Sequence, residues 1–137
     1  MFTPSPGDIP INAFIAVIAA WLLTEFIKVI VQYARKEPVV FFSLGGMPSV
    51  HSAIVGSLFL AVYFETGISL TLLIVGVFGS VVYRDAWGVR WEVTKHSKAL
   101  NKLLKTKEYE RTGHTRLEAM IGIIIGFVIA TLAYVIL

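Results

Sequence analysis

The sequence predicts an all-α membrane protein, a polytopic bundle of about four transmembrane helices. Its 137 residues are 56% hydrophobic and only 15% charged, and the mean hydropathy is +0.76. A soluble domain carries about 25% charged residues, so these values exclude an ordinary water-soluble globule. Four apolar stretches approach the roughly 20 residues that a helix needs to cross a bilayer. We expect one integral-membrane domain over residues 1–137.

The four expected spans follow one another along the chain. They run from Ile11 to Val31, from Leu44 to Phe64, from Thr66 to Tyr83 and from Ala119 to Leu137. Only a short turn separates the second span from the third, which predicts an antiparallel hairpin. Between the third and fourth spans, residues 92–112 are rich in lysine, and we expect a cytoplasmic loop or an amphipathic interfacial helix there.

The basic residues predict the orientation. All twelve Lys and Arg residues occur at Lys28, Arg35 and Lys36 or within residues 84–116. Short loops rich in Lys and Arg remain in the cytoplasm, so we expect both termini to face outside the cell membrane. The net charge of +3 then reflects topology and attraction to anionic lipid, and it does not indicate nucleic-acid binding.

Ionisable residues within spans are costly and are usually functional. Glu25, Lys28 and Gln32 form a stripe on the cytoplasmic half of the first span. Lys28 either pairs with Glu25 and extends to the interface, or points into a pocket. After the third span, Asp85 and Arg90 either pair with each other or leave Arg90 to bind an anion.

Two histidines stand near the expected starts of helices. Gly45 and Gly46 precede Pro48 and Ser49, and Ser49 is a suitable N-cap that places His51 in the first turn. Helix N-termini bind phosphate readily, so His51 is either a phosphate-site residue or a structural histidine.

The second histidine, His114, opens the fourth span. It is four residues from Glu118 and shares a helix face with it. A carboxylate that binds one imidazole nitrogen makes the other a better nucleophile or base; the alternative is an exposed capping pair. A third histidine, His96, is expected to lie on the solvated surface.

These polar residues gather at the cytoplasmic ends of the spans, which predicts a site for a phosphate ester. The chain has no cysteine, which excludes cysteine nucleophiles and thiolate metal sites. Without paired-Asp motifs, we expect a histidine mechanism with no metal and no cofactor. The glycine pair of Gly122 and Gly126 permits close helix packing, either within the chain or in a homo-oligomer.

Three motifs in order carry a family resemblance: GGMPSVHSA at residues 45–53, DAWGVR at 85–90 and GHTRLE at 113–118. Together they resemble the divergent branch of the phosphatidic acid phosphatase type 2 superfamily, which is related to acid phosphatases and vanadium haloperoxidases. The resemblance extends over essentially the whole chain from about residue 12. It implies a membrane-embedded phosphatase.

The superfamily motifs match in part. Lys28 and Arg35 have the spacing of the first motif, with Lys36 in place of its proline. The second motif, Pro-Ser-Gly-His, is matched by Pro48, Ser49 and His51, with Val50 in place of glycine.

The third motif is Ser-Arg, five residues, His, three residues and Asp. His114 and Glu118 match its last pair, but Glu108 stands six positions before His114 and the Ser-Arg pair is absent. The candidate replacements for the missing cation are Arg90 first, then Arg84 and Arg111.

The resemblance implies roles for these residues. His114 attacks phosphorus to form a phosphohistidine, Glu118 orients it, and His51 protonates the leaving alkoxide. The residues expected around the phosphate are Lys28, Arg35, Ser49, Arg90 and Asp85. The expected substrate is a phospholipid monoester, phosphatidylglycerophosphate, in the cytoplasmic leaflet. The alternatives are a polyprenyl or diacylglycerol pyrophosphate phosphatase, and a non-catalytic component that binds or transports anionic lipid.

Overall fold

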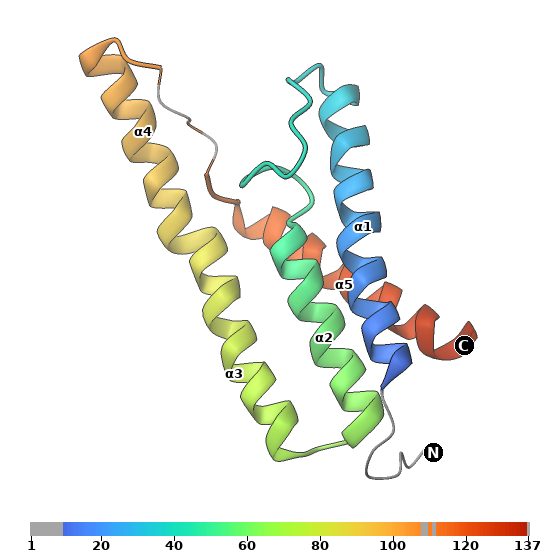
Figure 1. Ribbon diagram of the computed structural model, residues 1–137. Coiled ribbons are helices and arrows are strands. Elements are labelled where there is room, and N and C mark those ends of the chain that lie inside the picture. Colours follow the sequence, from blue (N-terminus) through green and yellow to red (C-terminus); the bar gives the residue numbers. More distant parts are fainter. Residues whose placement is uncertain (1–9, 108–109, 111, 137) are drawn as a thin grey trace.

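The computed structural model describes residues 10–107, 110 and 112–136, and within these residues it is all-helical (Figure 1). The elements are α1 (Ile11–Ala34), α2 (Val50–Thr66), α3 (Leu70–Arg84), the π-helical turn η1 (Asp85–Val89), α4 (Arg90–Leu104) and α5 (Arg116–Ile136). Among the described residues, three helical stretches are long and apolar enough to cross a membrane, namely α1, α5 and the continuous stretch from α3 through α4. The fourth apolar helix, α2, is shorter, at 17 residues. The predicted helical membrane bundle is confirmed.

The expected starts of the second and third spans were wrong. The second span was expected to begin at Leu44, but residues 44–48 are loop and α2 begins at Val50. Its N-cap is Ser49, as expected, and the Ser49 Oγ accepts the backbone N–H of Ser52 at 3.4 Å. The helix thus begins at the residue that can satisfy its first N–H groups.

The third span was expected to begin at Thr66, but Thr66 is the last residue of α2 and α3 begins at Leu70. Beyond Tyr83, the expected end of the span, the helix continues through η1 to Leu104. No proline interrupts this stretch, so the backbone remains helical beyond the apolar segment. The helix expected within residues 92–112 is therefore an extension of α3 (Figure 1).

Helix α2 lies at the centre and packs against α1, α3 and α5. Its approach to α5 depends on glycines. A Cβ atom on Gly122 would lie 2.3 Å from the Ser49 carbonyl oxygen, and one on Gly126 would lie 2.1 Å from the Ala53 carbonyl oxygen. Of the two interpretations of this glycine pair, the structure therefore uses it for packing within the chain.

Small residues form the interior, and large apolar residues face outward. The buried cluster consists of Ala16, Ala61 and Ala130, whereas Phe14 and Phe26 on α1 are 59% and 63% exposed. This distribution suits helices that pack closely with one another and face lipid on their outer surfaces.

Candidate active site

The N-terminal ends of α2 and α5 meet, and this junction forms the candidate site. The backbone N–H of Ser49 donates to the Glu118 carbonyl at 3.3 Å. Helix α5 begins with a capping box, in which Thr115 Oγ1 accepts the Glu118 N–H at 3.2 Å and Glu118 Oε2 accepts the Thr115 N–H at 2.8 Å. Two capped helix N-termini, with the partial positive charge of their dipoles, therefore converge beside His51 and His114.

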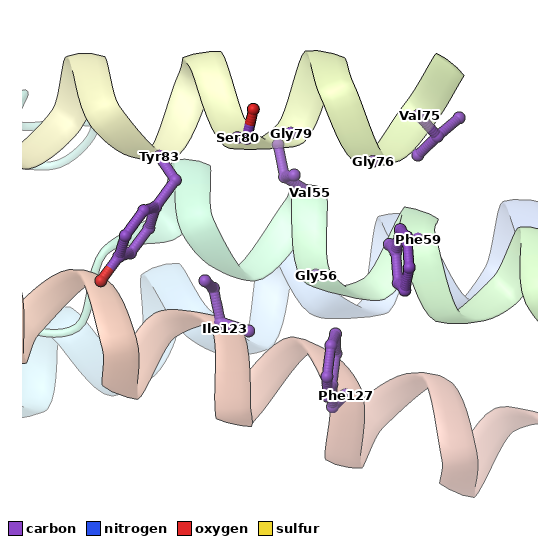
Figure 2. A pocket seen from close by; sticks show the side chains of 10 residues that line it. All are labelled: Val55, Gly56, Phe59, Val75, Gly76, Gly79, Ser80, Tyr83, Ile123 and Phe127. Carbon is purple, nitrogen blue, oxygen red and sulfur yellow. The ribbon is translucent and has the colours of Figure 1, made fainter. Parts of the chain in front are cut away.

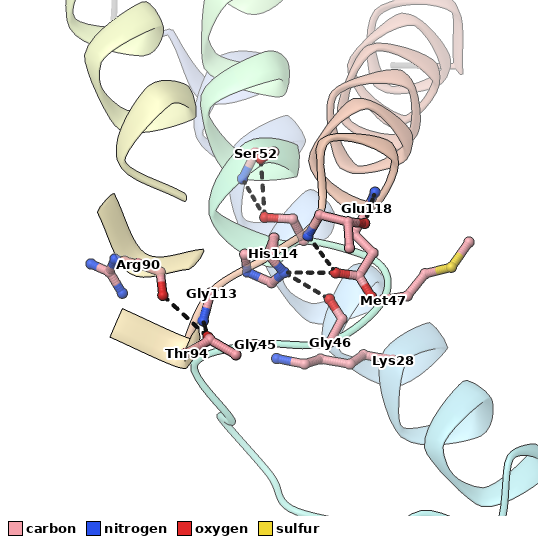
Figure 3. A network of polar contacts seen from close by, with 12 residues as sticks. Lys28, Gly45, Gly46, Met47, Ser52, Arg90, Thr94, Gly113, His114 and Glu118 are labelled. Carbon is pink, nitrogen blue, oxygen red and sulfur yellow. Dashed lines mark hydrogen bonds and ion pairs between the residues drawn. The ribbon is translucent and has the colours of Figure 1, made fainter. Parts of the chain in front are cut away.

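Contacts fix both the backbone and the imidazole ring of His114, and Figure 3 shows the ring beside Gly46 and Glu118. Its backbone N–H donates to the Ala86 carbonyl in η1 at 2.9 Å, and its imidazole is almost completely buried, with 1% exposure. The Nδ1 atom lies 2.8 Å from the Gly46 carbonyl oxygen. Because a carbonyl can only accept, Nδ1 carries the proton and Nε2 is left with its lone pair.

The carboxylate of Glu118 is a more distant neighbour of the same ring. Its Oε2 lies 4.0 Å from His114 Nδ1, which is beyond hydrogen-bond distance. The closer partner is the Gly46 carbonyl, and the Glu118 carboxylate lies at the limit of ion-pair distance from the same nitrogen, so its orienting role stays a prediction. Glu118 caps α5 and acts on the imidazole through its charge.

The environment keeps the His114 imidazole neutral. Its pKa is lowered to about 4, and burial is the largest cause; the Gly46 hydrogen bond and the Glu118 charge raise the pKa, and the positive charges of Lys28 and His51 lower it. The charges of Lys28 and His51 thus act on the same ring, which supports their grouping in one site.

The polar stripe on α1 is buried, and it contacts the loop before α2. Lys28 is 2% exposed, and its Nζ donates to the Ser43 carbonyl. Glu25 Oε1 accepts the Phe42 N–H at 2.7 Å. Of the two interpretations of Lys28, its burial favours the one that places it within the protein and not at the interface.

The other residues expected around the phosphate, besides Lys28, lie in different surroundings. Arg90 and Asp85 form an ion pair at 2.6 Å, as one interpretation expected, and their charges also act on His51. Arg35 is exposed and donates to Met47 Sδ at 3.4 Å, so its guanidinium is directed to Met47 and not to an imidazole. Ser49 is buried, and its Oγ also accepts a hydrogen bond from the Ser52 hydroxyl at 3.0 Å.

Three further predicted residues remain to be placed: Arg84 and Arg111, the alternative cations, and the third histidine, His96. Arg84 is exposed and lines a groove beside η1 that also includes Trp87 and Arg116. Arg111 lies outside the described residues. His96 is exposed on α4, as expected for a solvated surface residue.

Sequence reasoning missed the contacts that fix the segment before α5. Thr94 Oγ1 accepts the Gly113 N–H at 3.0 Å, and Thr112 Oγ1 donates to the Arg90 carbonyl at 3.2 Å. A Cβ atom on Gly113 would lie 2.4 Å from Arg90 backbone carbon, so glycine is required for this close approach. The spacing of Thr115 and Glu118 was a readable capping-box signal, whereas the Thr94 contact left no pattern in the sequence.

An apolar groove lies between α2, α3 and α5 (Figure 2). It has a volume of about 230 Å³, and its lining residues include Val55, Phe59, Gly79 and Phe127. Val55 is one helical turn along α2 from His51. The groove is therefore close to the histidine site and has the lining that an alkyl chain prefers.

Comparison with known proteins identifies the family of this chain. Residues 11–129, which include both histidines and the α1 stripe, match the divergent PAP2 family. The chain belongs to this family.

One curated relative is also similar to this divergent PAP2 protein. It is an uncharacterized membrane protein, YuiD, from Bacillus subtilis (strain 168), and it is 34% identical over 91 residues. The aligned region covers 64% of this chain and 58% of the relative. No solved structure gives a significant match. The family and the apolar helices establish a membrane protein of the divergent PAP2 family.

Proposed function

We propose that this divergent PAP2 protein is an integral-membrane lipid phosphate phosphatase, and that it hydrolyses a phosphomonoester through a phosphohistidine at His114. The observation that carries the proposal is the Nδ1–Gly46 hydrogen bond on a buried imidazole. It leaves the Nε2 lone pair available on a ring that is neutral at physiological pH. A neutral imidazole is the form that can act as a nucleophile.

The reaction then has two steps. Nε2 of His114 attacks phosphorus, the bond between phosphorus and the lipid oxygen breaks, and His51 supplies the proton to the leaving alkoxide. Water next attacks the phosphohistidine, which releases inorganic phosphate and restores the imidazole. Lys28, Arg90 and the N-termini of α2 and α5 are suited to stabilise the charge that develops on the phosphoryl oxygens.

A lipid is the substrate class that fits the surroundings. The apolar groove begins one turn from His51 and suits an acyl chain whose headgroup is at the histidines. The basic loops favour a cytoplasmic-facing site, which is why phosphatidylglycerophosphate is our first choice of substrate. Because His114 is 1% exposed, catalysis requires the loop around Gly46 or the segment before α5 to move when substrate binds.

The same burial favours a second candidate, a non-catalytic protein that binds anionic lipid. In that case Arg90, which is paired with Asp85 at 2.6 Å, holds a headgroup and His114 only stabilises the loop. The two candidates differ in what happens when His114 is removed, because binding survives and catalysis does not.

The test is phosphate release from phosphatidylglycerophosphate by the purified protein in detergent, with and without EDTA. His114→Ala is expected to lower the rate at least about a hundredfold, the lower end of what a nucleophile or general base contributes. His96→Ala is the matched control, since His96 is exposed on α4, and its rate should equal that of the wild type. Absence of release from this lipid and from phosphatidic and pyrophosphate lipids would reject the phosphatase and favour the binding protein. Loss of release with EDTA would show that a metal takes part.

A further inference from the structure

The loop between α1 and α2 combines exposed apolar side chains with a backbone that is held by buried polar groups. Phe41 and Phe42 are 67% and 68% exposed, and Val39, Val40 and Leu44 are also exposed. We propose that residues 38–44 form a re-entrant segment that lies within the bilayer and contacts lipid acyl chains. This inference goes beyond the proposed function and does not depend on it.

The first argument is depth. Glu25, which accepts the Phe42 N–H at 2.7 Å, lies six residues before Val31, the expected end of the first span. At a rise of 1.5 Å per residue, this is about 9 Å below the expected membrane boundary. The hydrocarbon core is about 30 Å thick, so a backbone at this depth beside a spanning helix is well inside it.

The second argument concerns the backbone of the loop. At membrane depth, the polar groups of an irregular backbone need partners in the protein or in a water-filled cavity, and three groups of this loop have partners on α1. The Val40 N–H donates to Gln32 Oε1 at 3.2 Å, the Phe42 N–H donates to Glu25, and the Ser43 carbonyl accepts from Lys28. Each residue of the α1 stripe therefore binds a backbone group of this loop, which explains three costly buried polar residues in one apolar helix.

The third argument indicates that lipid covers the exposed apolar side chains of this loop. The Phe42 ring packs against Trp21 of α1, with ring centroids 6.3 Å apart. Trp21 and its neighbours Leu22 and Phe26 are 41%, 56% and 63% exposed on a helix that can span the membrane. The apolar loop thus continues the lipid-facing surface of α1, and Figure 1 shows the loop running down beside the upper part of α1.

The absence of cysteine makes a direct test practical. Single variants Phe41→Cys, Phe26→Cys and Lys98→Cys are labelled with a nitroxide in liposomes, and collisions with oxygen and with a water-soluble nickel chelate are measured. Phe26 is the lipid reference on α1, and Lys98 is the exposed reference on α4. The label at position 41 is expected to collide with oxygen and be protected from nickel, as at position 26. Nickel access as at position 98, or protection from both reagents as in a protein interface, would overturn the proposal.

A second comparison tests the role of the α1 stripe. In the Phe41→Cys background, Glu25→Leu removes the acceptor for the Phe42 N–H, and the label is expected to shift toward nickel access. Glu25→Gln retains a side-chain oxygen acceptor and should keep the label protected. A label at Val77, which is exposed on α3, should be unchanged in both variants if the bundle remains folded. An unshifted label at position 41 in Glu25→Leu would contradict the tethering role.

Discussion

At the scale of single residues, the candidate site depends on how a buried histidine is kept neutral and oriented by a backbone carbonyl. His114 has 1% exposure, and its Nδ1 faces a backbone carbonyl, that of Gly46. A carbonyl fixes the tautomer without adding a charge, so burial remains the dominant effect and the pKa is lowered to about 4. The orienting group is therefore part of the loop that Lys28 and Glu25 hold in place.

This pKa shift predicts a pH dependence of stability. The folded state resists protonation of His114 down to about pH 4, whereas an unfolded histidine binds a proton below about pH 6.5. The stabilising contribution is thus complete above pH 6.5 and is lost as the pH falls toward 4, by about 3 kcal/mol in total. Thermal unfolding from pH 7 to pH 4.5 should show a smaller loss in His114→Gln than in the wild type. Parallel curves for the two proteins would contradict the shift.

The two roles of Glu118 can be separated by substitution. Glu118→Gln keeps an acceptor for the Thr115 N–H, whereas Glu118→Ala loses it and should destabilise the protein by about 1 kcal/mol. Unfolding in detergent gives the stability of each variant. Equal stability of the alanine and glutamine variants would reject the capping role.

At the scale of helices, the packing of α2 against α5 positions both histidines. Gly126 faces Ala53 and Gly122 faces Ser49, so the two N-terminal ends lie together. The turn η1 supplies the Ala86 carbonyl that holds the backbone of His114, and π-helical turns within α-helices occur frequently at functional sites.

Two glycine-to-alanine substitutions test this packing, one at the contact between the helices and one away from it. The Cβ atom in Gly126→Ala would lie 2.1 Å from the Ala53 carbonyl, whereas in Gly88→Ala its nearest neighbour is Arg84 Cγ at 3.9 Å. Gly126→Ala should destabilise the protein by about 1–3 kcal/mol through overpacking, and Gly88→Ala should be neutral or slightly stabilising. Thermal unfolding of both variants checks this, and equal midpoints would argue against the close approach of α2 and α5.

The sequence was informative about elements and about side chains, but not about backbone partners. Apolar runs located the four helices, and the Pro48-Ser49 pair located the start of α2. The extension of the helix to Leu104 was left open between a loop and an interfacial helix, because hydropathy falls after Tyr83 while nothing in the backbone ends the helix. The motifs identified both histidines, yet the Gly46 and Ala86 carbonyls could not be predicted, since every residue has a carbonyl and only the fold selects one.

At the scale of the whole molecule, the polar and basic residues gather toward one end of the helix bundle. The polar site, the basic segment after α3 and the C-terminal end of α1 lie toward the same end of the bundle (Figure 1). The opposite end contains the turn between α2 and α3, where Ile68 is 94% exposed. By the distribution of Lys and Arg, the first end is expected to face the cytoplasm.

The orientation can be measured in intact cells with single-cysteine variants. Ile68→Cys should react with a membrane-impermeant maleimide added outside, and Lys98→Cys should react only after the membrane is permeabilised. The reverse pattern would place the histidine site on the outer face and exclude a cytoplasmic-leaflet substrate.

The central claim is that His114 carries the phosphoryl group, and the most direct test is to trap that intermediate. The purified protein is mixed with a lipid phosphate labelled in its terminal phosphoryl group, quenched within one turnover and digested into peptides. We expect an acid-labile, alkali-stable label on the peptide that contains His114, present in His96→Ala and absent in His114→Ala. Turnover that leaves no label on this peptide, or that persists in His114→Ala, would contradict the account.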